Sequence, residues 1–170
     1  MNMKLRKSSF LFSVVIGLMG CQSTSESSTV EETVTNLSPQ AVIDFMSRCD
    51  NADSTAPGPI KQPLYVVGSF PDANWKHVPA RQYQYKGNNF YQAVTVEKDG
   101  SYKMQYATEL WSPQFTAKGR RLNVGELTEL TFGGYGTDTT VDIQQSGKYV
   151  WSLQFDEKGK PLNIMVNPCK

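Results

Sequence analysis

From residue 64 onward, apolar side chains recur at every second position in short runs separated by turn-forming residues. FYQAVTVE at 90–97 and GKYVWSLQF at 147–155 show this pattern most clearly. A period of two places alternate side chains on opposite faces of a β-strand. Many short strands at this spacing are typical of a β-sandwich, and the lack of helical segments between them indicates antiparallel pairing. We therefore expect an all-β, antiparallel sandwich.

The expected strands alternate in this way or are continuously apolar. They cover 64–70, 81–86, 90–97, 101–108, 114–117, 127–132, 139–144, 147–155 and 161–167. The segments GNN at 87–89 and DEKGK at 156–160 are expected to be hairpin turns.

One short helix is expected before the sandwich. Ser38 suits an N-cap and Pro39 suits the first helical position. Apolar residues then recur at helical spacing through about Arg48, namely Ala41, Val42, Phe45, Met46 and Cys49. The turn-rich connector DNADSTAPGPIKQP follows, so that 38–63 is expected to form a helix and connector and 64–170 the sandwich domain.

The start of the chain is ordered like a lipoprotein signal peptide. Basic residues at 4–7 precede the apolar run SSFLFSVVIGLM at 8–19, which is too short to span a bilayer. The tetrapeptide LMGC at 18–21 resembles the bacterial lipobox. This resemblance implies removal of 1–20 and lipidation of Cys21. An ordinary signal peptide with a chance cysteine, or an N-terminal anchor helix, are the alternatives.

The segment 21–37 is expected to be a lipidated, flexible tether, because it is rich in Ser, Thr and Glu and has few large apolar groups. Acyl chains on Cys21 would anchor the protein to a membrane. Gln22 after the cysteine suggests the outer membrane, with the leaflet left open.

Cys49 and Cys169 remain once Cys21 carries lipid. Export would place them in an oxidising compartment, where two cysteines usually pair. We expect a disulfide between them, and two buried free thiols are the alternative.

Composition argues against several classes of function. The formal net charge is +1, whereas a nucleic-acid binder usually carries a marked excess of positive charge. A single histidine argues against a histidine-based metal site or a Ser-His-Asp triad. The segment GGYG at 133–136 lacks the strand-before, helix-after context of a phosphate loop. No metal or cofactor is expected.

Two of the three tryptophans fall where strand alternation has stopped. Trp75 and Trp111 lie in polar loop segments, where an indole is well placed to stack on the apolar face of a sugar ring. Both are alternatively plugs that close one end of the sandwich. Trp151 lies inside an alternating strand and is expected in the core or on a sheet face.

The sequence LYVVGSFPDANW resembles the opening strand and loop of the immunoglobulin-like glycogen- and starch-binding modules. Such modules occur in isoamylases, pullulanases, branching enzymes and AMP-activated kinase β subunits, and are similar to those of Bacteroidetes outer-membrane lipoproteins. YQYKGNNFYQAVTVEKDGSYKMQYATELW and TTVDIQQSGKYVWSLQFDEKGKPLNIMV resemble the following strands in the same order. The resemblance covers about 63–167 and implies an immunoglobulin-like sandwich that binds α-glucan.

The resemblance implies stacking by Trp75 and Trp111 and hydrogen bonds from Lys103 to sugar hydroxyls. The first loop is longer than the family's, and 136–140 lacks the asparagine that the family often has there. Asp138 and Thr140 are candidate substitutes as hydrogen-bond partners. The segment 112–135 is also longer than in the compact modules.

His77 adjoins Trp75 and is a further candidate hydroxyl donor. The plainer alternatives are that Lys103 is a solvated strand residue and that His77 is an exposed loop residue.

The sequence therefore predicts a non-catalytic, lipid-anchored α-glucan-binding protein. Glycoside cleavage needs two positioned carboxylates, whereas Glu109 is the only acid beside Trp111 and has no evident partner. The alternative is a protein–protein scaffold or accessory lipoprotein of an envelope complex, with a protein partner and no glycan ligand.

Overall fold

The computed structural model describes residues 37–170, so that the expected signal peptide, the lipidation site Cys21 and the tether up to residue 36 lie outside the described residues. The elements are α1 (Pro39–Met46), β1 (Leu64–Gly68), the 3-10 turn η2 (Pro79–Arg81), β2 (Gln84–Tyr85), β3 (Phe90–Glu97), β4 (Gly100–Thr108), β5 (Gln114–Ala117), the 3-10 turn η3 (Lys118–Arg120), β6 (Arg121–Leu122), β7 (Thr128–Phe132), β8 (Thr139–Ile143), β9 (Gly147–Phe155) and β10 (Pro161–Pro168).

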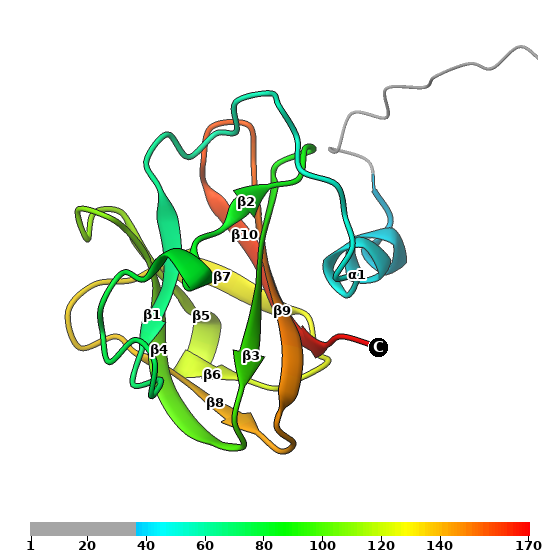
Figure 1. The fold of residues 1–170 in the computed structure, drawn as a ribbon. Coiled ribbons are helices and arrows are strands. Elements are labelled where there is room, and N and C mark those ends of the chain that lie inside the picture. The colour runs from blue at the N-terminus through cyan, green and yellow to red at the C-terminus, as the bar shows by residue number, and fades with distance from the viewer. Residues whose placement is uncertain (1–36) are drawn as a thin grey trace, which may run out of the picture. The chain divides into compact units, whose positions relative to one another are not determined.

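The strands form one continuous hydrogen-bonded path in the order β2-β3-β9-β10-β7-β5-β4-β8-β6, with β1 paired to β4 off this path. Strand β7 pairs with β10 on one side and β5 on the other, so the path folds over into two layers (Figure 1). Within residues 37–170, the strand pairings are antiparallel except that of the two-residue strand β6 with β8. The expected all-β, antiparallel sandwich with one short helix is confirmed.

The core between the layers is rich in aromatic side chains. Trp151 is fully buried, as expected from its place in an alternating strand. Its indole Nε1 donates to Thr95 Oγ1 at 2.8 Å, which gives the polar end of a buried tryptophan a partner. Phe70 packs edge-on against Trp151, with 5.8 Å between ring centroids.

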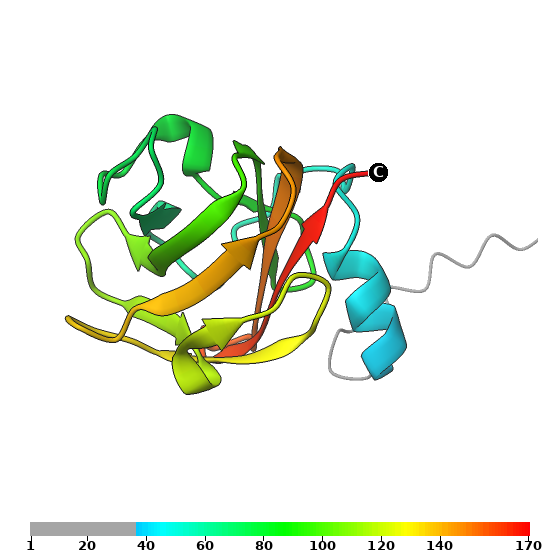
Figure 2. The ribbon, with the colours of Figure 1, turned by 90° about the horizontal axis from the view of Figure 1, so that it is seen from below.

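The helix α1 covers the outer face of the layer that contains β9 and β10 (Figure 2). Ser38 Oγ accepts from Ala41 N, which satisfies one free donor of the first turn, as its cap position predicts. The buried side chains Val42 and Met46 pack in a small cluster with Phe90 and Met165. The helix ends at Met46, two residues before the expected end.

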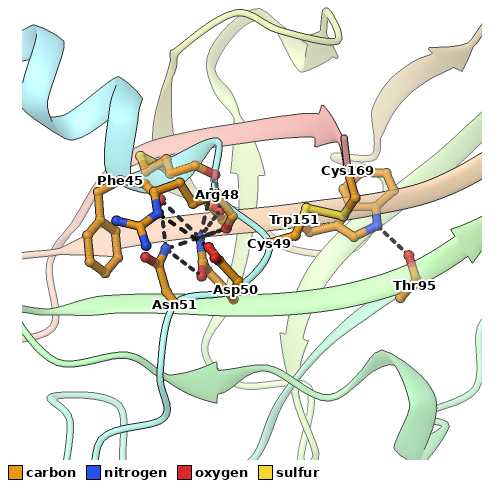
Figure 3. The surroundings of a disulfide bond; sticks show 11 residues. Phe45, Arg48, Cys49, Asp50, Asn51, Thr95, Trp151 and Cys169 are labelled. Atoms are coloured by element: carbon orange, nitrogen blue, oxygen red, sulfur yellow. Dashed lines mark hydrogen bonds and ion pairs between the residues drawn. A yellow bond between two sulfur atoms is a disulfide. The ribbon is translucent and has the colours of Figure 1, made fainter.

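The expected disulfide joins Cys49, just after α1, to Cys169, just after β10 (Figure 3). It closes a loop with a sequence separation of 120 residues. The bond therefore ties the helical segment to the last strand.

Among residues 37–170, no helix has the length and apolar character needed to cross a bilayer.

The strand expected at 81–86 is wrong in part, because only Gln84–Tyr85 pairs with β3. Pro79 opens a 3-10 turn that ends at Arg81, and Gln82 makes a single bridge to Tyr65. The alternation in this segment has a different origin. Arg81 is buried because it pairs with acidic side chains, and Tyr83 is buried in the aromatic core.

Candidate functional site: an aromatic-lined hollow

Trp75 sits at the end of a compact loop that follows β1. The buried side chains Phe70 and Ala73 fasten this loop to the core. The chain then folds back, and Trp75 N donates to Gly68 O at 2.7 Å. The loop is thus held at both ends, and the half-buried indole of Trp75 projects from a fixed backbone.

A buried ionic group anchors the same loop from the other side. The Arg81 guanidinium is 1% exposed, donates to Glu97 through two nitrogens, and donates to both carboxylate oxygens of Asp72 in the loop. It also lies over the Phe70 ring, 3.9 Å from the centroid. The hydrogen bonds from Arg81 lower the pKa of Asp72, against the opposing effect of burial.

Trp111 sits in the tight connection between β4 and β5. Its backbone N donates to Thr108 O at 2.8 Å, and Gln114 Nε2 donates back to Trp111 O. Thr108 Oγ1 donates to Pro113 O at 3.2 Å across the base of the connection. These bonds tie the loop to the two strands that flank it.

Both indoles are carried by backbone in the left-handed region, with φ of 66° at Trp75 and 61° at Trp111. A bulky residue rarely adopts this conformation, which costs on the order of 1–3 kcal/mol and persists only where the surroundings enforce it. Such strain concentrates at functional sites. Trp111 also keeps 37% of its surface exposed, although burial would stabilise the fold.

The two indoles line one hollow of about 580 Å³. This volume lies within the range of small-ligand pockets. Its lining residues are Trp75, Gln105, Trp111, Gln114, Tyr135, Gly136 and Asp138. They come from the loop after β1, from β4, from the β4–β5 connection, from β5 and from the loop between β7 and β8. The structure therefore brings together the two tryptophans that the sequence singled out, and adds amide and carboxylate groups beside them.

His77 packs behind this hollow rather than lining it. Its ring meets Trp111 edge-on at 4.7 Å between centroids and Tyr65 at 5.1 Å. The imidazole Nε2 is buried and has no hydrogen-bond partner. His77 thus supports the Trp111 indole, and the structure gives its predicted role as a hydroxyl donor no direct contact with the hollow.

Lys103 and Thr140 face each other across β4 and β8, and neither lines the hollow. Lys103 is exposed and lies two residues before Gln105 in β4. The two-residue period puts Lys103 and Gln105 on the same outer face of the sheet. Asp138, named from the sequence as a possible substitute for a missing asparagine, does line the hollow and accepts from Gln105 Nε2 at 2.8 Å.

Sequence reasoning missed Gln105, Gln114 and Tyr135. Tyr135 is wholly exposed and sits between Gly134 and Gly136, which is an unusual position for a large ring and is a signal in the sequence itself. The two glutamines carry no comparable signal, because an outward-facing glutamine in a strand is common.

Within residues 37–170, no group of three or more His, Cys, Asp or Glu side chains is arranged to hold a metal ion.

No family model and no curated protein sequence matches the chain. Among solved structures, the chain is similar to the starch-binding domain (SBD) of AmyP, in a structure described as ligand-induced. The two share 45% sequence identity with a TM-score of 0.60, and the match covers 91% of this chain and 97% of that one. The chain belongs to the family of the AmyP starch-binding domain. The resemblance to starch-binding sandwich modules is thus supported at the level of a carbohydrate-binding module.

Proposed function

We propose that the protein binds α-glucan chains in the hollow between Trp75 and Trp111. The observation that carries the proposal is the pairing of two strained tryptophans in one hollow. The family relationship to the AmyP starch-binding domain supports the choice of α-glucan as the ligand.

The hollow offers both kinds of contact that a sugar needs. The indole faces suit the apolar faces of glucose rings, and aromatic stacking contributes roughly 0.5–1.5 kcal/mol per ring. The polar groups of Gln114 and Asp138 suit the hydroxyl groups at the ring edges. Few charges take part, so binding is expected to depend little on salt. Binding of this kind needs no catalytic group, and the proposal includes no reaction.

Retention on an amylose affinity gel tests the role of the two indoles. Trp75→Ala and Trp111→Ala are each expected to weaken retention, because each removes a stacking surface. Phe132→Ala is the matched control, since Phe132 is an exposed aromatic side chain that does not line the hollow. Unchanged retention in both tryptophan variants would contradict the proposal. A stable protein partner recovered from membranes, with no glucan retention, would instead support the envelope scaffold.

We also propose that lipid on Cys21 anchors the protein at the outer membrane. The lipobox-like LMGC and the following Gln22 support this location. The expected result is that wild-type protein partitions with outer-membrane fractions and takes up labelled palmitate, whereas Cys21→Ser does neither. Palmitate uptake by Cys21→Ser would overturn the assignment of the anchor.

A further inference from the structure

The carboxamide of Gln105 has a fixed orientation. Its Nε2 donates to Gly134 O at 2.9 Å and to Asp138 Oδ1 at 2.8 Å, so that both amide hydrogens are used. A carbonyl and a carboxylate only accept hydrogen bonds, and the reversed amide would set its oxygen against both. Gln105 Oε1 is therefore held pointing away from Gly134 and Asp138.

This oxygen is an acceptor without a donor. Gln105 is only 3% exposed, and its Oε1 is buried with no hydrogen-bond partner. Within residues 37–170, four buried side-chain atoms are in this condition, and Gln105 Oε1 is the one whose residue lines the hollow. Buried polar groups almost always have partners, so an orphan beside a binding hollow calls for a ligand atom.

We propose that Gln105 is a specificity-determining residue, whose Oε1 accepts a hydrogen bond from one hydroxyl group of the sugar that stacks on Trp75 and Trp111. This inference rests on the proposed function and adds the polar group that distinguishes one sugar from another. Oε1 carries a partial negative charge, and the neighbouring Asp138 carboxylate carries a full one. Both repel anions, so the site selects neutral sugar rings over phosphorylated or uronic ones.

The loop 133–138 holds the nitrogen of the Gln105 carboxamide and leaves the Oε1 side free of its contacts. The carbonyl of Gly134 caps the amide, and neither Gly134 nor Gly136 has any atom within 4 Å of the place a Cβ would take. Arg120 holds the far side of the loop through Gly136 O at 2.8 Å. The loop thus stays fixed on the nitrogen side of the carboxamide, and a hydroxyl group reaches Oε1 from the hollow that Gln105 lines.

Isothermal titration calorimetry with methyl α-maltotrioside and its monodeoxy analogues tests the inference. For the wild-type protein, loss of one particular hydroxyl is expected to weaken binding about tenfold, the usual effect of leaving one buried polar group unpaired. Gln105→Met keeps the approximate shape and removes both the acceptor and the amide that bonds Gly134 and Asp138. It should bind the parent sugar about tenfold more weakly and lose nothing further with that one analogue. Gln145→Met, at an exposed glutamine in the turn after β8, is the matched control and should keep the full penalty.

The inference would be overturned if every monodeoxy analogue weakened binding to Gln105→Met by the same factor as it weakens binding to the wild type. The proposed function would then remain intact. Failure of the wild-type protein to bind methyl α-maltotrioside would overturn both. If Gln105→Met does not fold, Asp138→Ala provides the test, because it releases the carboxamide from one of its two anchors. The selective hydroxyl penalty should then shrink, and its persistence at full size would count against the role of Gln105.

Discussion

Trp75 and Trp111 each have a positive φ, which is unfavourable for a bulky residue, and each side chain is partly exposed to solvent. Neither property stabilises the fold. A plug at one end of the sandwich would not require either property, whereas the proposed stacking role is consistent with both. Their types and loop positions were predictable from the sequence. Their strain and their common hollow depend on contacts among segments far apart in the chain, which a periodic pattern does not encode.

The backbone strain at Trp111 can be separated from its proposed stacking role by comparing two substitutions. Trp111→Gly and Trp111→Ala should lose glucan affinity equally, since both remove the indole. The glycine variant should be more stable by about 1 kcal/mol, because glycine adopts positive φ without the steric cost that alanine incurs. Urea unfolding of both variants measures the difference. Equal or reversed stabilities would mean that the backbone at Trp111 is not strained.

The site is assembled by strand ends and the loops between them. Predictions for 90–97, 114–117 and 147–155 agree with β3, β5 and β9, because the pattern that indicates a strand lies within each segment and needs no distant contact. The strand expected at 81–86 failed because burial of Arg81 depends on Glu97, which lies 16 residues further along the chain. The two-residue strand β6 is too short to show any period. Gln105 was not predicted as a site residue because its partners come from the distant loop at 134–138.

The loop that carries Trp75 should loosen in acid. The pKa of Asp72 is lowered in the folded protein by its bonds to Arg81, so the pair stabilises the fold above the ordinary aspartate value of about 4. That stability is lost as the pH falls through the lowered value. Urea unfolding at pH 6 and pH 3 should show a smaller decrease for Asp72→Asn than for wild type. An identical decrease would show that Asp72 does not couple the loop to Arg81.

Arg81 itself should be far more sensitive to substitution. Arg81→Met leaves Glu97 buried without its cation, which typically costs about 3–5 kcal/mol. Adding Glu97→Gln should recover part of the loss, because it removes the unpaired charge. Thermal unfolding of the single and double variants measures this recovery. A double variant less stable than Arg81→Met alone would contradict this account of the buried group.

Over the whole described molecule, the segment that fastens the helix is separate from the segments that build the hollow. The disulfide joins the end of α1 to the end of β10, whereas the strands flanking the hollow pair among β1, β4, β5, β7 and β8. The disulfide was predictable from the sequence, because the expected export and the two remaining cysteines together favour a single pairing. The position of α1 against β9 and β10 was not predictable, since the apolar face of the helix does not indicate which strands it packs against.

Removing the disulfide should therefore lower stability and spare binding. The combined variant Cys49→Ser, Cys169→Ser should lose up to about 5 kcal/mol, because the bond closes a long loop in the unfolded chain. Its affinity for maltoheptaose, measured where it remains folded, should match that of the wild type. A large loss of affinity in a folded variant would show that the helix and the hollow are coupled.

The most direct test of glucan binding is tryptophan fluorescence of the intact chain, titrated with maltoheptaose and with cellohexaose as the control. Trp151 is fully buried, so any change reports mainly on Trp75 and Trp111. We predict a saturable change with maltoheptaose and none with cellohexaose. The absence of a change with maltoheptaose, or an equal change with both sugars, would contradict α-glucan recognition in the hollow.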